Sequence, residues 1–389
     1  MFERHITEQL TKYLAQYPVV TITGPRQSGK TTLCKKFKNR PYVSLEDPHQ
    51  RERALKDPLQ FLKDYKGGTI DEFQKVPLLT SYIQGLVDDW NEEGVYILTG
   101  SQQFEAMSQV SQSLAGRTAL LKLLPFSCGE IKNEFQTEKL ATSIWRGFYP
   151  RIYDKNLNPY EAMSFYFQTY IERDVRALIN IKNLNQFERF VRLCAGRTGQ
   201  LLNLQNLAGE VGVSYHTINE WISVLEASYI IYRLQPHYKN YGKRLTKTTK
   251  LYFWDTGLCC FLLGIQSPEQ LQLHPFYGSL FETFVISELY KQQYNKGKLP
   301  SFYYWRTSSN EIDLLMDFGS TLFPLEIKSG TTIASDFFKG LNFYLSQDPQ
   351  LTKGALVYGG RDSYTQNNIR IISYLDITML SDLDYQLKI

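Results

Sequence analysis

The sequence predicts an α/β protein with several domains, and two observations lead to this class. Through about residue 130, β-type apolar runs alternate with helical segments, which is typical of a parallel sheet covered by helices. A chain of 389 residues is also too long for one hydrophobic core, so about two or three domains are expected. The β-type runs of the first part are residues 19–23, 42–45, 69–70, 95–98 and 119–123.

These patterns divide the chain into successive parts. Residues 1–130 are predicted to form the α/β core, and residues 131–195 are mostly helical, as expected of a lid or linker. Residues 196–263 hold a helix-turn-helix pattern followed by two β-type runs, which predicts a winged helix. Residues 275–389 form a C-terminal α/β domain, and we expect a flexible joint at 264–275 before it.

Composition indicates a compact globular protein that is soluble and cytoplasmic. Hydrophobic residues make up 43% of the chain, yet no apolar run approaches the length that spans a bilayer, so no membrane partner is expected. The charged opening MFERHITEQL lacks an apolar signal core. The five cysteines show neither disulfide pairing nor metal-ligand spacing, which favours reduced thiols. The net charge of +4 is too small to indicate a nucleic-acid partner by itself.

The strongest motif is a glycine-rich loop directly after the first β-type run. The segment GPRQSGKT, residues 24–31, fits the eight-position phosphate-binding loop without a mismatch. Its glycines let backbone N–H groups surround a phosphate, and the following helix adds the positive end of its dipole. We expect Lys30 to reach the β- and γ-phosphates of ATP and the Thr31 hydroxyl to ligate Mg²⁺. The predicted nucleotide contacts in the loop are Gly24, Pro25, Arg26, Gln27, Ser28, Gly29, Lys30, Thr31 and Thr32.

A phosphate loop needs an acidic partner, and the segment GGTIDEFQKVP supplies two candidates. Asp71 is expected to hold the Mg²⁺ shell, and Glu72 to polarise the attacking water. The alternative is an ordinary surface acid, because the run before them is weakly apolar. After the run 95–98, Ser101 or Gln102 is placed to sense the γ-phosphate, since ligands of open α/β sheets lie at strand carboxyl ends. A simple strand-ending turn is the alternative for these two residues.

Several segments together resemble a family of predicted prokaryotic ATPases of the AAA superfamily, and the resemblance covers nearly the whole chain. It implies an N-terminal ATPase core, a winged-helix segment and a C-terminal domain similar to restriction-endonuclease-like PD-(D/E)XK nucleases. The biological role of that family is mostly unassigned. The segments that carry the resemblance are GPRQSGKTTL, DEFQKVPLL, LTGSQQF, SLAGRTALLKLLPFS, AGRTGQLLNL, KLYFWDTGL and LEIKSG.

The segment SLAGRTALL places Arg117 just before a β-type run. AAA-type proteins similar to this one present an arginine there to the nucleotide of a neighbouring subunit, where a guanidinium stabilises charge on the transferred phosphoryl group. The resemblance therefore implies a catalytic role for Arg117 and a homo-oligomer formed through the ATPase core. The alternative is a loop arginine paired with a local acid.

The predicted winged helix contains a basic connection. Asn203 is expected to cap the first helix, Gly212 to end it, and Ser214 to cap the second. The second helix exposes no Lys or Arg that could read a base edge, so a helical lid or an assembly surface remains an alternative. The candidate nucleic-acid contacts, which would bind phosphates without sequence preference, are Lys239, Lys243, Arg244, Lys247 and Lys250.

The C-terminal part holds a second candidate metal site. Asp313 and Glu326 flank a predicted hairpin that turns at 317–320, and alternation places Lys328 on the same face as Glu326. Paired carboxylates can hold Mg²⁺, and a lysine can orient the attacking water. This pattern resembles the acid, acid-x-lysine core of the nuclease family, with Glu282 as the helical acid. A fold match does not guarantee cleavage.

Two functional hypotheses follow. In the first, ATP and Mg²⁺ drive an ATPase that acts on nucleic acid, with DNA favoured over RNA. In the second, the ATPase regulates a protein partner and the nuclease-like domain is catalytically inactive. The basic connection at 239–250 favours the first hypothesis, and the uncharged face of the second helix favours the second.

Overall fold

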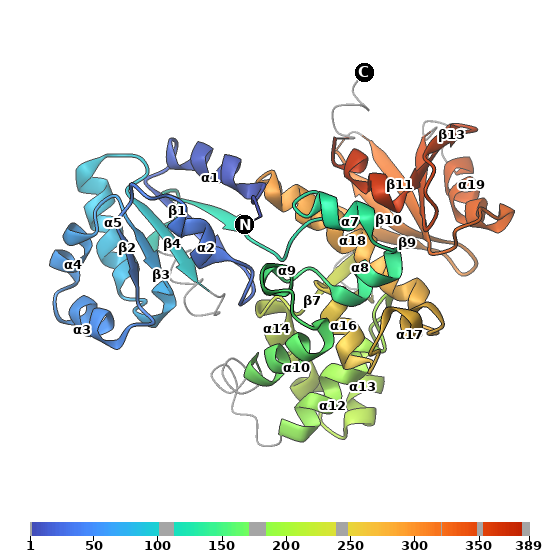
Figure 1. Ribbon diagram of the computed structural model, residues 1–389, viewed down its shortest axis with the longest axis horizontal. Coiled ribbons are helices and arrows are strands. Elements are labelled where there is room, and N and C mark those ends of the chain that lie inside the picture. Colours follow the sequence, from blue (N-terminus) through green and yellow to red (C-terminus); the bar gives the residue numbers. More distant parts are fainter. Residues whose placement is uncertain are drawn as a thin grey trace. The chain divides into compact units, whose positions relative to one another are not determined.

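The computed structural model describes residues 2–100, 113–170, 184–238, 248–319, 321–347 and 353–382 of the chain (Figure 1). The chain divides into two compact units. The first comprises residues 1–126 with the short segments 227–229 and 294–298. The second comprises residues 127–226, 230–293 and 299–389.

The first unit is built on a five-stranded sheet with the strand order β2-β3-β4-β1-β5. Every neighbouring pair in it is parallel, which confirms the predicted α/β class with a parallel sheet. Each predicted β-type run of this part contains a strand. The strands are β1 (Val19–Thr23), β2 (Tyr42–Ser44), β3 (Thr69–Asp71), β4 (Tyr96–Gly100) and β5 (Thr118–Lys122).

Helices cover both faces of this sheet, because alternate strand side chains point to opposite sides. One core packs Val19 and Leu98 against α3, α4 and α5, and the other packs Val20 and Ile97 against α1 and α2. The helices are α1 (Ile6–Leu14), α2 (Lys30–Lys35), α3 (Pro48–Lys56), α4 (Pro58–Asp64) and α5 (Leu79–Trp90), with the short 3-10 turn η1 (Phe73–Lys75) after β3.

The second unit begins with helices, as the sequence predicts for residues 131–195. Asn203 then caps α13 by accepting a hydrogen bond from the Asn206 backbone N–H, and Gly212 ends that helix with a φ of 81°. Ser214 Oγ accepts from the Thr217 backbone N–H at the start of the next helix. The elements are α7 (Lys132–Thr137), α8 (Leu140–Arg146), α9 (Pro150–Lys155), α10 (Pro159–Tyr170), α12 (Leu184–Ala195), β6 (Gln200–Leu201), α13 (Leu204–Val211) and α14 (Tyr215–Ala227).

The segment predicted as a flexible joint, 264–275, contains an ordered helix instead. Ser267 caps α17 (Pro268–Gln272), and Leu271 in it is completely buried. The two buried apolar residues of this segment, Ile265 and Leu271, show little helical periodicity, which is why the sequence favoured a linker.

The strands of the second unit form one nine-stranded sheet with the order β13-β14-β12-β11-β10-β9-β7-β8-β6. β7 and β9 pair in parallel, with Gln235 opposite Tyr303, so the strands of the predicted winged helix and those of the C-terminal part share one sheet. The remaining elements are β7 (Ile231–Pro236), β8 (Lys250–Phe253), α16 (Thr256–Leu262), α18 (Tyr277–Asn295), β9 (Phe302–Arg306), β10 (Glu311–Asp317), β11 (Leu322–Lys328), η3 (Ser335–Phe338), α19 (Lys339–Ser346), β12 (Gly354–Tyr358), β13 (Tyr364–Gln366), β14 (Ile369–Ser373) and η4 (Tyr374–Asp382).

Within the described residues, no helix is both long enough and apolar enough to cross a membrane.

Candidate nucleotide site and a second acidic cluster

The loop between β1 and α2 is held tightly against the sheet. A Cβ added at Gly24 would lie 2.1 Å from the carbonyl oxygen of Leu123, so no larger residue fits there. Gly29 has a φ of 94°, in the left-handed region that favours glycine, and it starts α2. The lack of room for a side chain at Gly24 and the left-handed backbone at Gly29 therefore explain why both positions are glycine. Gln27 also has a positive φ, of 60°.

Lys30 folds back over its own loop. Its Nζ donates hydrogen bonds to the carbonyl oxygens of Gly24 (2.9 Å) and Pro25 (2.7 Å), and the residue is only 6% exposed. Ser28 Oγ is buried and has no hydrogen-bond partner within the part of the chain that the structure describes. An unpaired buried hydroxyl is costly, so this atom is suited to a ligand that accepts its hydrogen bond.

Asp71 ends β3 beside the start of α2. Its Oδ2 accepts hydrogen bonds from Thr31 Oγ1 (2.7 Å) and from the Tyr42 hydroxyl (2.6 Å), while Thr99 Oγ1 donates to its Oδ1. The parallel pairing sets Asp71 opposite Thr99, while Tyr42 reaches Asp71 from the neighbouring strand β2. Thr31 and Asp71 thus meet as an oxygen pair of the kind that Mg²⁺ prefers.

Glu72 follows Asp71 in a left-handed backbone conformation, with a φ of 57°. Burial raises the pKa of its carboxyl above the ordinary value, while the charge of Lys30 lowers it. Gln74 Nε2 donates a hydrogen bond to Glu72 Oε2. A Cβ added at Gly100 would meet Gln74 Oε1 at 2.1 Å, so the absence of a side chain there leaves room for the amide.

Supporting residues of this site have no motif of their own in the sequence. Arg4 donates to the carbonyl oxygen of Ser28 (2.5 Å) in the loop and to that of Leu124 (2.7 Å). Tyr42, Thr99 and Gln74 surround the two acids. The position of Thr99 near the carboxyl end of β4 was a signal that could have indicated it, whereas Tyr42 is the first residue of β2 and had no such signal. Nothing in the sequence indicates Arg4.

The remaining predicted residues of the first unit are placed as follows. Arg117 makes a two-pronged ion pair with Asp88, with Nε–Oδ1 at 2.6 Å and NH2–Oδ2 at 2.7 Å. In the single chain Arg117 is thus a loop arginine paired with a local acid, which was the alternative to a role at a neighbour's nucleotide. Thr32 lies exposed on α2, and Arg26 lies close enough to Glu72 to lower its pKa. Ser101 and Gln102 lie outside the described residues.

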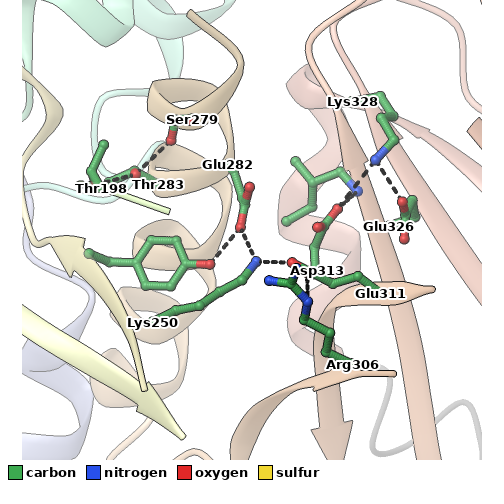
Figure 2. A network of polar contacts seen from close by, with 12 residues as sticks. Thr198, Lys250, Ser279, Glu282, Thr283, Arg306, Glu311, Asp313, Glu326 and Lys328 are labelled. Atoms are coloured by element: carbon green, nitrogen blue, oxygen red, sulfur yellow. Dashed lines mark hydrogen bonds and ion pairs between the residues drawn. The ribbon is translucent and has the colours of Figure 1, made fainter. Parts of the chain in front are cut away.

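The four C-terminal candidates gather in the second unit, on α18, β10 and β11 (Figure 2). β10 and β11 form the predicted antiparallel hairpin, with Leu314 opposite Leu325. Lys328 Nζ lies 2.6 Å from Glu326 Oε1 and 3.7 Å from Asp313 Oδ2. Asp313 Oδ2 also accepts a 2.8 Å hydrogen bond from the Ile327 backbone N–H.

Lys250 completes this cluster and is placed differently from the prediction that grouped it with a solvent-facing basic connection. The residue is 3% exposed, and its Nζ lies 3.2 Å from Glu282 Oε1 and also pairs with Glu311 Oε1. The Tyr252 hydroxyl donates to the same Glu282 oxygen at 2.5 Å. Because all of β8 is buried in the sheet, Lys250 is not available to a phosphate backbone. The other four predicted contacts, Lys239, Lys243, Arg244 and Lys247, lie outside the described residues.

Burial dominates the electrostatics of this cluster. It raises the pKa of Glu282 to about 7 and that of Glu326 to about 8, because the charged forms are poorly solvated. Burial lowers the pKa of Lys250, but Glu282, Asp313 and Glu311 together raise it above the ordinary value. In the described part of the chain, no group of three or more His, Cys, Asp or Glu side chains is arranged to hold a metal ion.

Three known domain families match successive parts of the chain. Residues 16–132 match an AAA domain, and residues 137–269 and 277–378 match two domains of unknown function, DUF8612 and DUF4143. The chain is 30% identical over 370 residues to the uncharacterized protein Rv2008c of Mycobacterium tuberculosis, covering 93% of this chain and 81% of that protein. It is 23% identical over 331 residues to an uncharacterized protein of Haemophilus influenzae, covering 76% of this chain and 80% of that one.

Among solved structures, the Walker-type ATPase PABY2304 of Pyrococcus abyssi aligns with 67% of this chain and 96% of its own, at 15% identity and a TM-score of 0.44. The chain therefore belongs to the protein family of Rv2008c and carries an AAA domain at residues 16–132.

Proposed function

We propose that the protein is a Mg²⁺-dependent ATPase whose nucleotide site is formed by the loop 24–31 with Asp71 and Glu72. One observation carries this proposal. The Thr31 hydroxyl and the Asp71 carboxylate are 40 residues apart in the sequence and meet at 2.7 Å, beside the buried Lys30 and a loop in which Gly24 has no room for a side chain. The unpaired Ser28 Oγ in the same loop supports a phosphate ligand.

Each residue has a definite role in this proposal. Bound ATP and Mg²⁺ supply the reactive phosphoanhydride and a positive charge that offsets developing negative charge. Lys30 exchanges its bonds to the Gly24 and Pro25 carbonyls for the β- and γ-phosphates. Thr31 and Asp71 hold the metal ion. Glu72, kept in place by Gln74, accepts the proton of the attacking water.

The test measures phosphate release from ATP by the purified chain with Mg²⁺, with excess chelator, and in an Asp71→Asn variant. We expect turnover only for the unchanged chain with Mg²⁺. Equal phosphate release in all three samples would overturn the assignment of Asp71 and of the metal.

We also propose that ATP hydrolysis is coupled to binding of nucleic acid, with DNA favoured over RNA. Two features support this. Helix α12, strand β6, helices α13 and α14 and the antiparallel pair β7 and β8 follow each other in the order of a winged helix. The connection between β7 and β8 carries Lys239, Lys243, Arg244 and Lys247 and no acid. The test measures ATP turnover at low salt with single-stranded DNA, duplex DNA and RNA. We expect nucleic acid to stimulate turnover, and a rate unchanged by all three would overturn the coupling.

A homo-oligomer formed through the ATPase core is part of the same proposal. In the single chain Arg117 is bound to Asp88, and both side chains are partly exposed. An exposed pair of this kind contributes little stability, so a phosphate of a neighbouring subunit can compete for the guanidinium.

A second candidate function is an ATP-driven regulator of a protein partner with an inactive nuclease-like domain. The observation that favours it is the pairing of the acids of the second unit with Lys250 and Lys328. The exposed face of α14 also carries Tyr215 and His216 but no Lys or Arg that could bind a phosphate. Binding assays with nucleic acid separate the two functions, because only the first requires it.

A further inference from the structure

We infer that Lys250 is a built-in counter-ion that occupies the place of a divalent cation, so that the acidic cluster of the second unit neither holds a metal nor cleaves nucleic acid. This deepens the second candidate function, since it gives a physical reason for an inactive nuclease-like domain. It does not depend on the nucleotide site, which lies in the other unit.

The first step is the position of the ammonium group. Figure 2 shows Lys250 between Glu282 on α18 and Glu311 on β10. Its Nζ lies 3.2 Å from Glu282 Oε1 and pairs with Glu311 Oε1. The negative charge of Asp313 also favours the charged form of Lys250. A metal ion that bridged the acids of α18 and β10 would compete with this ammonium for the same carboxylates.

The second step is the use of the remaining oxygens. Lys328 Nζ forms an ion pair with Glu326 Oε1 at 2.6 Å. Asp313 Oδ2 already accepts a hydrogen bond from the Ile327 backbone N–H. Glu326 Oε2 is buried and has no hydrogen-bond partner in the described ranges, but it faces Gly340, where an added Cβ would come within 3.2 Å of it. The start of α19 therefore lies close to this oxygen. Mg²⁺ completes its six oxygen ligands with water but still needs about one or two carboxylates, and Glu282, Glu311 and Glu326 are each already paired with a lysine.

The third step is charge. Four acids, Glu282, Glu311, Asp313 and Glu326, face the three cations Lys250, Lys328 and Arg306 across the ion pairs of this cluster. One net negative charge remains when all are ionised. A divalent cation would add excess positive charge to a buried site, and expelling Lys250 instead would leave its ammonium without the partners that make its burial tolerable.

The sheet explains why this lysine is present. β8 lies in the nine-stranded sheet only because β7 pairs with β9, and that continuity directs Lys250 and Tyr252 toward Glu282. The cation thus comes from the predicted winged-helix segment and the acids from α18 and the C-terminal strands.

The test measures Mn²⁺ binding to the full ATP-free chain by electron paramagnetic resonance of free Mn²⁺. All samples carry Asp71→Asn, which removes the candidate metal ligand of the nucleotide site. With Lys250 present we expect no Mn²⁺ bound at the cluster. Lys250→Met should create a site with a Kd on the order of 10⁻⁴ M, typical of a weak carboxylate site. Adding Asp313→Asn should abolish it, and Lys250→Arg, which keeps the charge, should bind no Mn²⁺.

Two outcomes would overturn the inference. One is Mn²⁺ binding with Lys250 present that Asp313→Asn removes. The other is a folded Lys250→Met chain that binds no Mn²⁺. If Lys250→Met does not fold, the samples that retain Lys250 or carry Lys250→Arg still test the inference, because neither should bind Mn²⁺ at the cluster. A cleavage assay on DNA with Mn²⁺ is the second test. Cleavage that is lost in Asp313→Asn would contradict the inference. ATP turnover of the unchanged chain is a separate measurement, so failure of the ATPase proposal is distinguishable.

Discussion

Lys30 is the residue of the first unit whose loss should have the largest effect on nucleotide binding. The residue is almost completely buried, and its ammonium donates to the carbonyls of Gly24 and Pro25 in its own loop. Since it is the positive charge of that loop nearest to the predicted phosphates, Lys30→Ala should weaken ATP binding by about 2–3 kcal/mol or more, the range for a hydrogen bond to a charged group. Titration calorimetry with ATP and Mg²⁺ checks this.

The matched control is Lys38→Ala, which removes an exposed lysine just beyond α2. Its ATP affinity should equal that of the unchanged chain. Equal affinity in Lys30→Ala would contradict the role of the loop.

Glu72 should separate hydrolysis from binding. Its backbone N–H donates to Asp71 Oδ1 at 3.2 Å, while its carboxylate accepts from Gln74. Glu72→Gln keeps the size and the contact to Gln74, yet it cannot accept a proton. We expect unchanged ATP affinity and turnover reduced about 10²–10⁴-fold. Single-turnover hydrolysis measures this, and a variant that hydrolyses ATP at the unchanged rate would exclude Glu72 as the base.

At the scale of elements, α18 and the β10–β11 hairpin bury acids whose pKa values make stability depend on pH. The pKa of Glu326 rises from 4.5 to about 8 and that of Glu282 to about 7. An acid whose pKa is raised by folding stabilises the protein fully below its unfolded pKa, and this contribution is lost as the pH rises through the folded pKa. The melting temperature of the second unit should therefore fall between about pH 5 and pH 8.

Glu326→Gln should flatten this fall, because the amide does not ionise. Calorimetry of the full chain across the same pH range measures it, with Glu52→Gln, an exposed acid on α3, as the control that should leave the fall unchanged. A fall of the same size in Glu326→Gln would show that this carboxyl does not ionise over the range.

The basic connection between β7 and β8 can be tested as one element. Replacing Lys243, Arg244 and Lys247 together by Gln should weaken nucleic-acid binding and reduce the slope of log affinity against log salt by roughly 2–3, since each lost phosphate contact contributes about 0.9. Basal ATP turnover should not change. The control replaces three exposed lysines of the preceding helical segment, Lys132, Lys139 and Lys155, which should leave the salt slope as it was.

At the scale of the whole molecule, assembly decides whether Arg117 acts on a neighbour. Arg117→Ala and Lys30→Ala chains should each be inactive. In an equal mixture, about a quarter of the interfaces pair an intact Lys30 with an intact Arg117 from the next subunit, so turnover should recover to roughly a quarter of the unchanged value. Asp88→Ala, which only frees Arg117, should remain active. A mixture without recovery would leave Arg117 as the partner of Asp88 alone.

The sequence by itself determined the features that depend on spacing along the chain. Gly24, Gly29, Lys30 and Thr31 lie within eight residues, and the caps at Asn203 and Gly212 lie within ten, so local geometry fixes them. The parallel sheet of the first unit and the hairpin of β10 and β11 were likewise predictable from apolar runs and turn residues. Such features can be predicted from the sequence because the residues that form them are close together along the chain.

Only the tertiary structure decided which distant residues meet. Tyr42 and Thr99 reach Asp71 because β2, β3 and β4 are neighbours, an order that no local pattern specifies. Lys250 was grouped by sequence with the basic residues before it, and the pairing of β7 with β9 buries it among acids that follow it by 32 residues or more. The same ammonium group can bind a phosphate in water or neutralise a buried carboxylate, and the choice is made by burial, which depends on how strands far apart in the chain pack together.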